Sequence, residues 1–281
     1  MERYRRIGPG LTGVFAVFSG LAFLAFLAFL ALYVVGGHTD QIFSWTILPA
    51  RTAGFLGAAY AGALVLFAGA LHDRVWARAR ISVLPPAVFS GAMLVATLMH
   101  LEKFHLDSPE VLPRAIAWLW LVVYVVVPPA LVALFLRQQR RPGADPAPDE
   151  PLPVPLKLVM GVLAALMTGF GVALFAEPSG TPWPWTLTPL TGRATAAWLL
   201  GLGWALVQGL VDGDRARLRP GFAAIGVTAL LDLLASVRYR DSMDWTGTAS
   251  WSYVLAVAAI AAMAAAALLS FPGGERAGRA R

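Results

Sequence analysis

The most unusual polar residue in this sequence is an acid inside an apolar run. Asp232 lies within residues 227–234, where every neighbour except Thr228 is aliphatic. A carboxylate at such a depth is costly, so it usually faces a bundle interior or a water-filled cavity and often marks a substrate or proton path. Arg193 and Arg51 stand near the starts of two other apolar runs, at a depth similar to that expected for the acid, and either could offset its burial. Asp232 is therefore either the polar element of a substrate path or half of an ion pair that locks helices together.

A second polar set stands in segments expected outside the membrane and combines histidine with carboxylates, which can bind a metal or move protons. Its members are His38, Asp40, His100, Glu102 and His105. His100 and His105 are five residues apart, about 140° around a helix, so one helix would not direct both at the same ion. The spacing also differs from H-E-x-x-H. We therefore expect a solvated outer-loop cluster, no metal and no cofactor, and the absence of cysteine excludes thiolate sites.

The composition requires a membrane to hold these residues. Hydrophobic side chains make up 58% of the 281 residues and charged ones only 14%, more apolar surface than a soluble core can hide. A bilayer needs about 20 apolar residues per helix. Eight such runs occur, at residues 11–35, 52–71, 81–99, 115–136, 158–176, 194–211, 221–237 and 251–270. The sequence thus predicts an all-α polytopic membrane protein with about eight transmembrane helices. Pro85-Pro86 and Pro128-Pro129 fall inside the third and fourth runs, where we expect bends.

The basic residues predict the orientation of these helices. Of the 22 Lys and Arg residues, six fall in the segments expected outside, namely Arg51, Lys103, Arg114, Arg193, Arg238 and Arg240. The others fall in the segments expected inside, as the positive-inside rule predicts for eight spans with both termini cytoplasmic in the cell (inner) membrane. The net charge of +6 is therefore topological and gives no reason to expect a nucleic-acid partner. Most tryptophans fall near the outer boundary, where indole rings prefer the headgroup region.

An internal repeat divides the chain. The pattern W-T-x-x-P occurs at Trp45 to Pro49 and again at Trp185 to Pro189, each time just before a long apolar run, so we interpret it as an outer interface motif. Continuing the match without a gap pairs Gly57 with Ala197, Ala61 with Gly201 and Gly69 with Gly209, and residues 103–105 match 238–240 after small gaps. Six prolines in residues 142–155 indicate an extended linker. We expect a first four-helix half at 1–141, a proline-rich cytoplasmic linker at 142–156 and a second half at 157–281. An even number of helices per half makes the repeat parallel.

The segments around the two W-T-x-x-P motifs, residues 43–58 and 183–191, resemble those of uncharacterised polytopic membrane proteins from high-GC bacteria. The resemblance covers the repeat core, about half of the chain, and it implies no activity and no catalytic residues.

Three functions are compatible with these features. The leading interpretation is a small permease or channel-like protein for a small or lipidic molecule, with a path between the halves and Asp232 as its polar element. The second is a membrane scaffold or assembly factor, in which small-residue helix faces hold partner helices. The third is a membrane-embedded enzyme that uses His100, Glu102 and His105. The expected partners of the protein are the lipid bilayer and a lipid or small-molecule ligand. The sequence leaves the oligomeric state open.

Overall fold

A computed structural model of the chain describes residues 4–35 and 39–269, and in this part every regular element is a helix. The long helices are α1 (Pro9–Val35), α3 (Ala50–Asp73), α5 (Leu84–Met99), α6 (Val111–Gln139), α7 (Val154–Ala176), α8 (Pro189–Asp212), α9 (Arg215–Arg238) and α10 (Thr248–Leu269). Two short helices are α2 (Thr39–Ile42) and α4 (Trp76–Ala79). The prediction of an all-α fold is therefore confirmed for the described residues.

Seven helical segments in the described part are long and apolar enough to cross a bilayer. They are α3, the segment Trp76–Met99 that joins α4 to α5, and α6 to α10. In α1, Pro9–Phe23 is also apolar. This is the composition of a multi-pass membrane protein.

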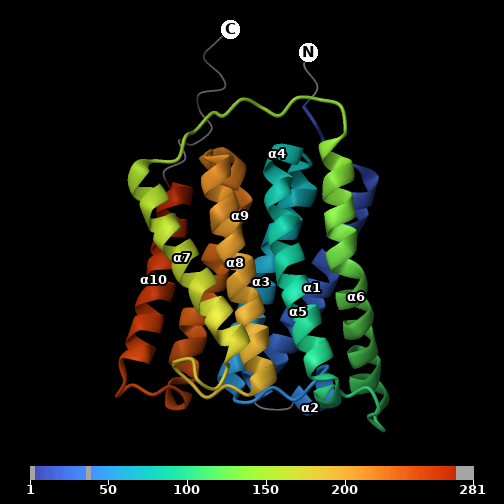
Figure 1. The fold of residues 1–281 in the computed structure, drawn as a ribbon, viewed down its shortest axis with the longest axis vertical. Helices are drawn as coiled ribbons and strands as arrows, with labels where there is room; N and C mark the ends of the chain where they lie inside the picture. Colours follow the sequence, from blue (N-terminus) through green and yellow to red (C-terminus); the bar gives the residue numbers. More distant parts are fainter. Residues whose placement is uncertain (1–3, 36–38, 270–281) are drawn as a thin grey trace.

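The chain crosses from one end of the bundle to the other with each long helix (Figure 1). One end, called here the linker end, holds the start of α1, the end of α6, the extended segment between α6 and α7, and the end of α10. The opposite end, called the α2 end, holds α2 and the loops that follow α5, α7 and α9. Of the 18 Lys and Arg residues in the described part, twelve stand in segments at the linker end: Arg5, Arg6, Arg74, Arg78, Arg80, Arg137, Arg140, Arg141, Lys157, Arg215, Arg217 and Arg219.

Four helices form the centre of the bundle and four lie outside them. In the centre, α3 packs against α9 and α5 packs against α8. Outside, α1 packs on α3, α6 on α5, α7 on α8 and α10 on α9. Both central contacts depend on a glycine, because a Cβ atom at Gly62 would lie 2.7 Å from the Ala224 backbone oxygen and one at Gly201 would lie 2.9 Å from Phe89 Cβ. Small residues at these points let the backbones approach, which is how helices associate in lipid.

One expectation about prolines was wrong. Pro85 and Pro86 do not interrupt a helix, because they occupy the first turn of α5, after the 3-10 turn Arg80–Ser82. The first turn has no intrahelical partners for its N–H groups, so proline costs no hydrogen bond there. Pro128 and Pro129 lie inside α6, as expected.

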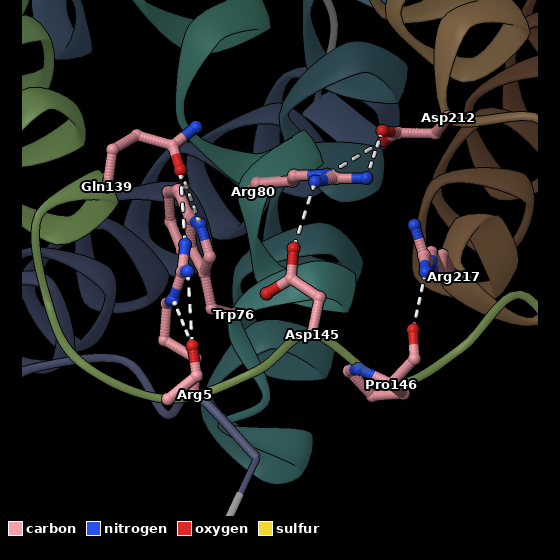
Figure 2. A network of polar contacts seen from close by, with 9 residues as sticks. Arg5, Trp76, Arg80, Gln139, Asp145, Pro146, Asp212 and Arg217 are labelled. Atoms are coloured by element: carbon pink, nitrogen blue, oxygen red, sulfur yellow. Dashed lines mark hydrogen bonds and ion pairs between the residues drawn. The ribbon is translucent and has the colours of Figure 1, made fainter.

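The proline-rich segment at the linker end contacts residues from several segments that lie far apart in the sequence (Figure 2). Arg80, just after α4, forms ion pairs with Asp145 of this segment, at 3.4 Å, and with Asp212 at the end of α8. Arg5 donates to the Gly143 carbonyl oxygen at 3.1 Å, and Arg217 donates to that of Pro146. The segment is extended up to Pro153, whereas residues 154–156, which were expected in the linker, already belong to the first turn of α7. Its contacts give the extended part a defined path.

Candidate functional site

Asp232 is buried in an ion pair between α9 and α3. Its Oδ1 atom lies 2.8 Å from Nη2 of Arg51, and the two side chains are 3% and 0% exposed. Tyr253 of α10 donates its hydroxyl hydrogen to Asp232 Oδ2, and Arg51 Nη2 also donates to Ser236 Oγ at 2.9 Å. The Arg51 guanidinium lies over the Trp185 ring, 4.2 Å from its centroid. These contacts offset part of the desolvation of both charges, while Arg51 Nε and Nη1 have no hydrogen-bond partner among the described residues, so the group has the make-up of a buried structural ion pair.

Arg193, the other partner considered for Asp232, contacts a different residue. Its Nη1 atom lies 3.0 Å from Nε2 of His100, the residue that follows α5. Burial lowers the pKa of His100, and the nearby Arg193 and Lys103 lower it further, while Glu102 acts in the opposite direction. A neutral His100 can accept the hydrogen bond from Arg193 through Nε2. Arg193 therefore joins α8 to the end of α5 and leaves Asp232 to Arg51.

The outer-loop polar cluster does not converge. The His105 ring contacts the segment around the first motif through both of its nitrogens. Nδ1 lies 3.0 Å from the Phe43 carbonyl oxygen, and Nε2 lies 3.2 Å from Thr46 Oγ1. His105 therefore holds the first W-T-x-x-P segment in place. His100 Nδ1 is 3.9 Å from Glu102, beyond hydrogen-bond distance, and Asp40 is exposed on α2. His38 lies outside the described residues. Among the residues that the structure covers, no three His, Asp or Glu side chains are grouped to hold a metal ion.

Both tryptophans of the W-T-x-x-P motifs are buried, which corrects the expectation that their rings lie among lipid headgroups. Trp45 is 2% exposed and Trp185 4%. Trp45 packs against Phe43 and Trp120 with ring centroids 4.8 and 4.9 Å apart. In the second motif, Trp185 packs against Trp183 and Tyr253 at 5.3 and 5.2 Å. The rings point inward because aromatic side chains of α6 and α10 supply an apolar surface for them.

The motif residues at the helix starts differ between the two copies. Pro49 directly precedes α3, whereas Pro189 is the first residue of α8. Thr188 and Thr191 form a reciprocal capping box at the start of α8, and α3 has no side-chain cap. Trp185 links the second motif to α3 by donating its indole N–H to Thr52 Oγ1 at 2.9 Å.

A cavity of about 560 Å³ lies between α1, α3, α5, α6, α8 and α9. Its size is within the roughly 300–1,000 Å³ typical of small-molecule sites. The side chains that line it are apolar or aromatic apart from five hydroxyl groups, those of Ser44, Tyr60, Ser90, Tyr124 and Thr228. No charged side chain of the described residues lines it, and Asp232 and Arg51 are not part of its wall. The cavity and the ion pair are therefore separate features.

The cavity has an aromatic wall near the middle of the bundle. Phe89 and Trp198 face each other with ring centroids 4.0 Å apart, and Trp120 and Tyr124 are 4.3 Å apart. Tyr60 meets the edge of Trp198 at 5.3 Å. The aromatic residues of this wall were not identified as site candidates from the sequence. The available signal was the position of Tyr60 and Tyr124 inside long apolar runs, where a phenol hydroxyl needs a partner.

Comparison of the chain with protein-family models, with curated proteins and with solved structures gave no match.

Proposed function

We propose that this protein is a permease-like membrane protein that binds a lipidic molecule in the cavity between its central helices. The observation that carries the proposal is the cavity itself, because it is large enough for a small ligand and lined almost entirely by apolar groups. Such a lining favours hydrocarbon over ions or charged solutes. The Arg51–Asp232 pair supports a structural role for Asp232, since both side chains are buried in contact with each other and away from the cavity.

We also propose that the chain forms two parallel four-helix halves with eight spans, α1 being the first. The helix contacts support this, because α1–α3, α3–α9 and α9–α10 have counterparts in α7–α8, α8–α5 and α5–α6. The backbone at the linker end supports it too. Ile7 donates to the Arg74 carbonyl and Trp76 to that of Arg5, while in the other half Leu152 donates to Gly213 and Arg215 to Glu150.

The twelve basic residues at the linker end support a cytoplasmic position for that end of the bundle. Both termini would then be cytoplasmic, and the inner membrane of a bacterium is the setting we propose.

A membrane scaffold is the second candidate. The interlocked α3–α9 and α5–α8 contacts, with their buried ion pair, favour a rigid body that could hold partners. An enzyme at the α2 end has less support, because His100 and His105 are engaged separately, by Arg193 and by the Phe43–Thr46 segment.

Native mass spectrometry of the protein purified in mild detergent tests the leading proposal. We expect a retained lipidic mass on the wild-type protein. In Ala205→Phe, a side chain that lines the cavity grows by a ring and should displace the ligand. Ala165→Phe is the matched control, because Ala165 is exposed on α7 and does not line the cavity. The proposal would be contradicted if the wild-type protein retained no lipid, or if Ala205→Phe retained as much lipid as the wild type.

A further inference from the structure

Two tyrosine hydroxyls pair with each other inside the cavity. Tyr60 of α3 and Tyr124 of α6 both line it, and their hydroxyl oxygens are 3.3 Å apart. Tyr60 is the eleventh residue of α3 and Tyr124 the fourteenth of α6, so the pair lies near the middle of both helices. The side chains that carry it come from two helices that both contribute to the wall of the cavity.

A count of hydrogen atoms leaves this pair with an unused donor. The other three cavity hydroxyls each donate to a backbone carbonyl: Ser44 to Ile116 at 3.4 Å, Ser90 to Ala87 at 3.3 Å and Thr228 to Ala224 at 3.0 Å. The two tyrosines together have two hydroxyl hydrogens and share a single hydrogen bond. Within the described part of the chain, one tyrosine O–H therefore has no acceptor.

We infer that the Tyr60–Tyr124 pair is the polar anchor for the cavity's ligand, an elongated apolar molecule that carries an uncharged acceptor oxygen such as the carbonyl of an ester, a ketone or a quinone. This inference rests on the proposed function and specifies the class of its ligand. A buried donor without an acceptor costs free energy, and a ligand carbonyl would remove that cost. A carboxylate is disfavoured, because no cationic side chain of the described residues lines the cavity to pair with it.

The surroundings of the pair fit an extended or flat ligand. Phe89 packs on Tyr124 with ring centroids 5.9 Å apart and on Trp198 at 4.0 Å, so the anchor stands within the aromatic wall. Along the rest of the cavity, aliphatic side chains such as Leu66, Leu202 and Leu206 provide the surface for a hydrocarbon chain. The ligand would thus be oriented by one hydrogen bond and held by apolar contact.

Occupancy by two matched probes tests the inference. Methyl tetradecanoate and n-pentadecane have chains of similar length, and only the ester has an acceptor. We expect native mass spectrometry at equal probe concentrations well below saturation to give about three- to ten-fold higher occupancy for the ester on the wild-type protein, the value of one hydrogen bond. Tyr60→Phe and Tyr124→Phe should each keep this preference, because the remaining tyrosine then has a free hydroxyl. The double variant Tyr60→Phe/Tyr124→Phe should lose it and still bind both probes.

The controls separate the two proposals. Replacing both partners of a hydrogen bond by apolar groups of the same shape is nearly neutral for stability, so the double variant should fold with an unchanged unfolding midpoint. Tyr4→Phe, an exposed tyrosine outside the cavity, is the matched control and should retain the ester preference. Equal occupancy by both probes on the wild type, or an ester preference that survives in the double variant, overturns the inference and leaves the proposed function standing. Binding of neither probe overturns both.

Discussion

The two central helix contacts have similar backbones and different buried residues. Both α3 and α8 have 24 residues, and so do the segments that they pack against. Helix α3 packs against Arg215–Arg238, and α8 packs against Trp76–Met99. Helix starts then correspond as Ala50 with Pro189 and Trp76 with Arg215. With this register, the positions of Arg51 and Asp232 in the α3–α9 contact are taken by Leu190 and Met93 in the α8–α5 contact, and these two are buried in the same apolar core.

The comparison teaches that the helix geometry does not require a charge at this position. One contact is closed by a buried ion pair and the other by hydrocarbon, with similar helix lengths and similar glycine-mediated approaches. An ion pair of this kind often contributes no more than apolar residues of similar size would. Either charge alone would be costly in lipid, so arrangements that separate Arg51 from Asp232 are disfavoured.

The largest expected effect comes from breaking the ion pair on one side. Asp232→Ala leaves Arg51 buried and unpaired, and we expect a loss of about 3–5 kcal/mol in the free energy of unfolding. Denaturant titration in detergent measures it. Asp241→Ala, at a side chain that is 97% exposed, is the control and should change little. A loss below about 1 kcal/mol for Asp232→Ala would mean that the pair does not stabilise the contact.

Next in size are substitutions at the two glycines of close approach. Gly62→Ala and Gly201→Ala should each cost about 1–3 kcal/mol, because the new methyl group meets backbone or Cβ atoms of the facing helix. Gly91→Ala is the control, since a Cβ atom there has nothing within 4 Å, and it should be neutral or slightly stabilising. The same unfolding titration applies. If only one of the two glycines proved sensitive, the two contacts would not be equivalent.

A smaller effect is expected when the ion pair is replaced by the residues of the other contact. The free energy of unfolding of Arg51→Leu/Asp232→Met should lie within about 1.5 kcal/mol of the wild-type value. Its loss should be far smaller than that of Asp232→Ala, because the two buried charges disappear together. Retention of lipid by native mass spectrometry should not change, because neither residue lines the cavity. Normal stability together with lost lipid binding would instead give Asp232 a functional role.

The smallest effect concerns pH and the α8–α5 contact. Because burial and Arg193 hold the pKa of His100 below its ordinary value of 6.5, the folded protein binds this proton less readily than the unfolded chain. The contribution of His100 to the free energy of unfolding should therefore be complete above pH 6.5 and fall as the pH drops from there through the lower pKa of the folded state. His100→Gln can still accept from Arg193 but does not titrate. Its loss of unfolding midpoint between about pH 8 and about pH 5 should be smaller than that of the wild type. Equal losses would place the titrating group elsewhere.

Much of the architecture could be predicted from the sequence, but the positions at which α3 and α8 correspond could not. Seven of the eight predicted apolar runs match, with approximate bounds, the seven segments of the described residues that are long and apolar enough to cross a bilayer. The W-T-x-x-P match pairs Gly57 with Ala197 and Ala61 with Gly201, whereas helix starts and contacts pair Ala58 with Ala197 and Gly62 with Gly201. The shift arises because Pro49 precedes its helix while Pro189 begins one.

The loops that follow α5 and α9 show the same limit. Residues 103–105 were matched with 238–240, but the 3-10 turns Leu101–Lys103 and Arg240–Ser242 occupy comparable positions, so Phe104 corresponds to Met243. A sequence match cannot place a gap inside a short loop of low similarity. Backbone hydrogen bonds place it, because His105 donates to Ser44 and Asp244 donates to Pro184.

The sequence by itself determined that this chain is a bundle of apolar helices. A run of about 20 apolar residues spans a bilayer as an α-helix, because only then are its backbone N–H and C=O groups paired within the run. It also indicated that Asp232 needs a partner and named Arg51 as one of two candidates. Only the tertiary structure decided between Arg51 and Arg193, turned both motif tryptophans inward, and left the cavity with its Tyr60–Tyr124 pair. The physical reason is that burial cost depends on a residue's own type and its neighbours along the chain, whereas partners and cavities depend on how helices far apart in the sequence pack.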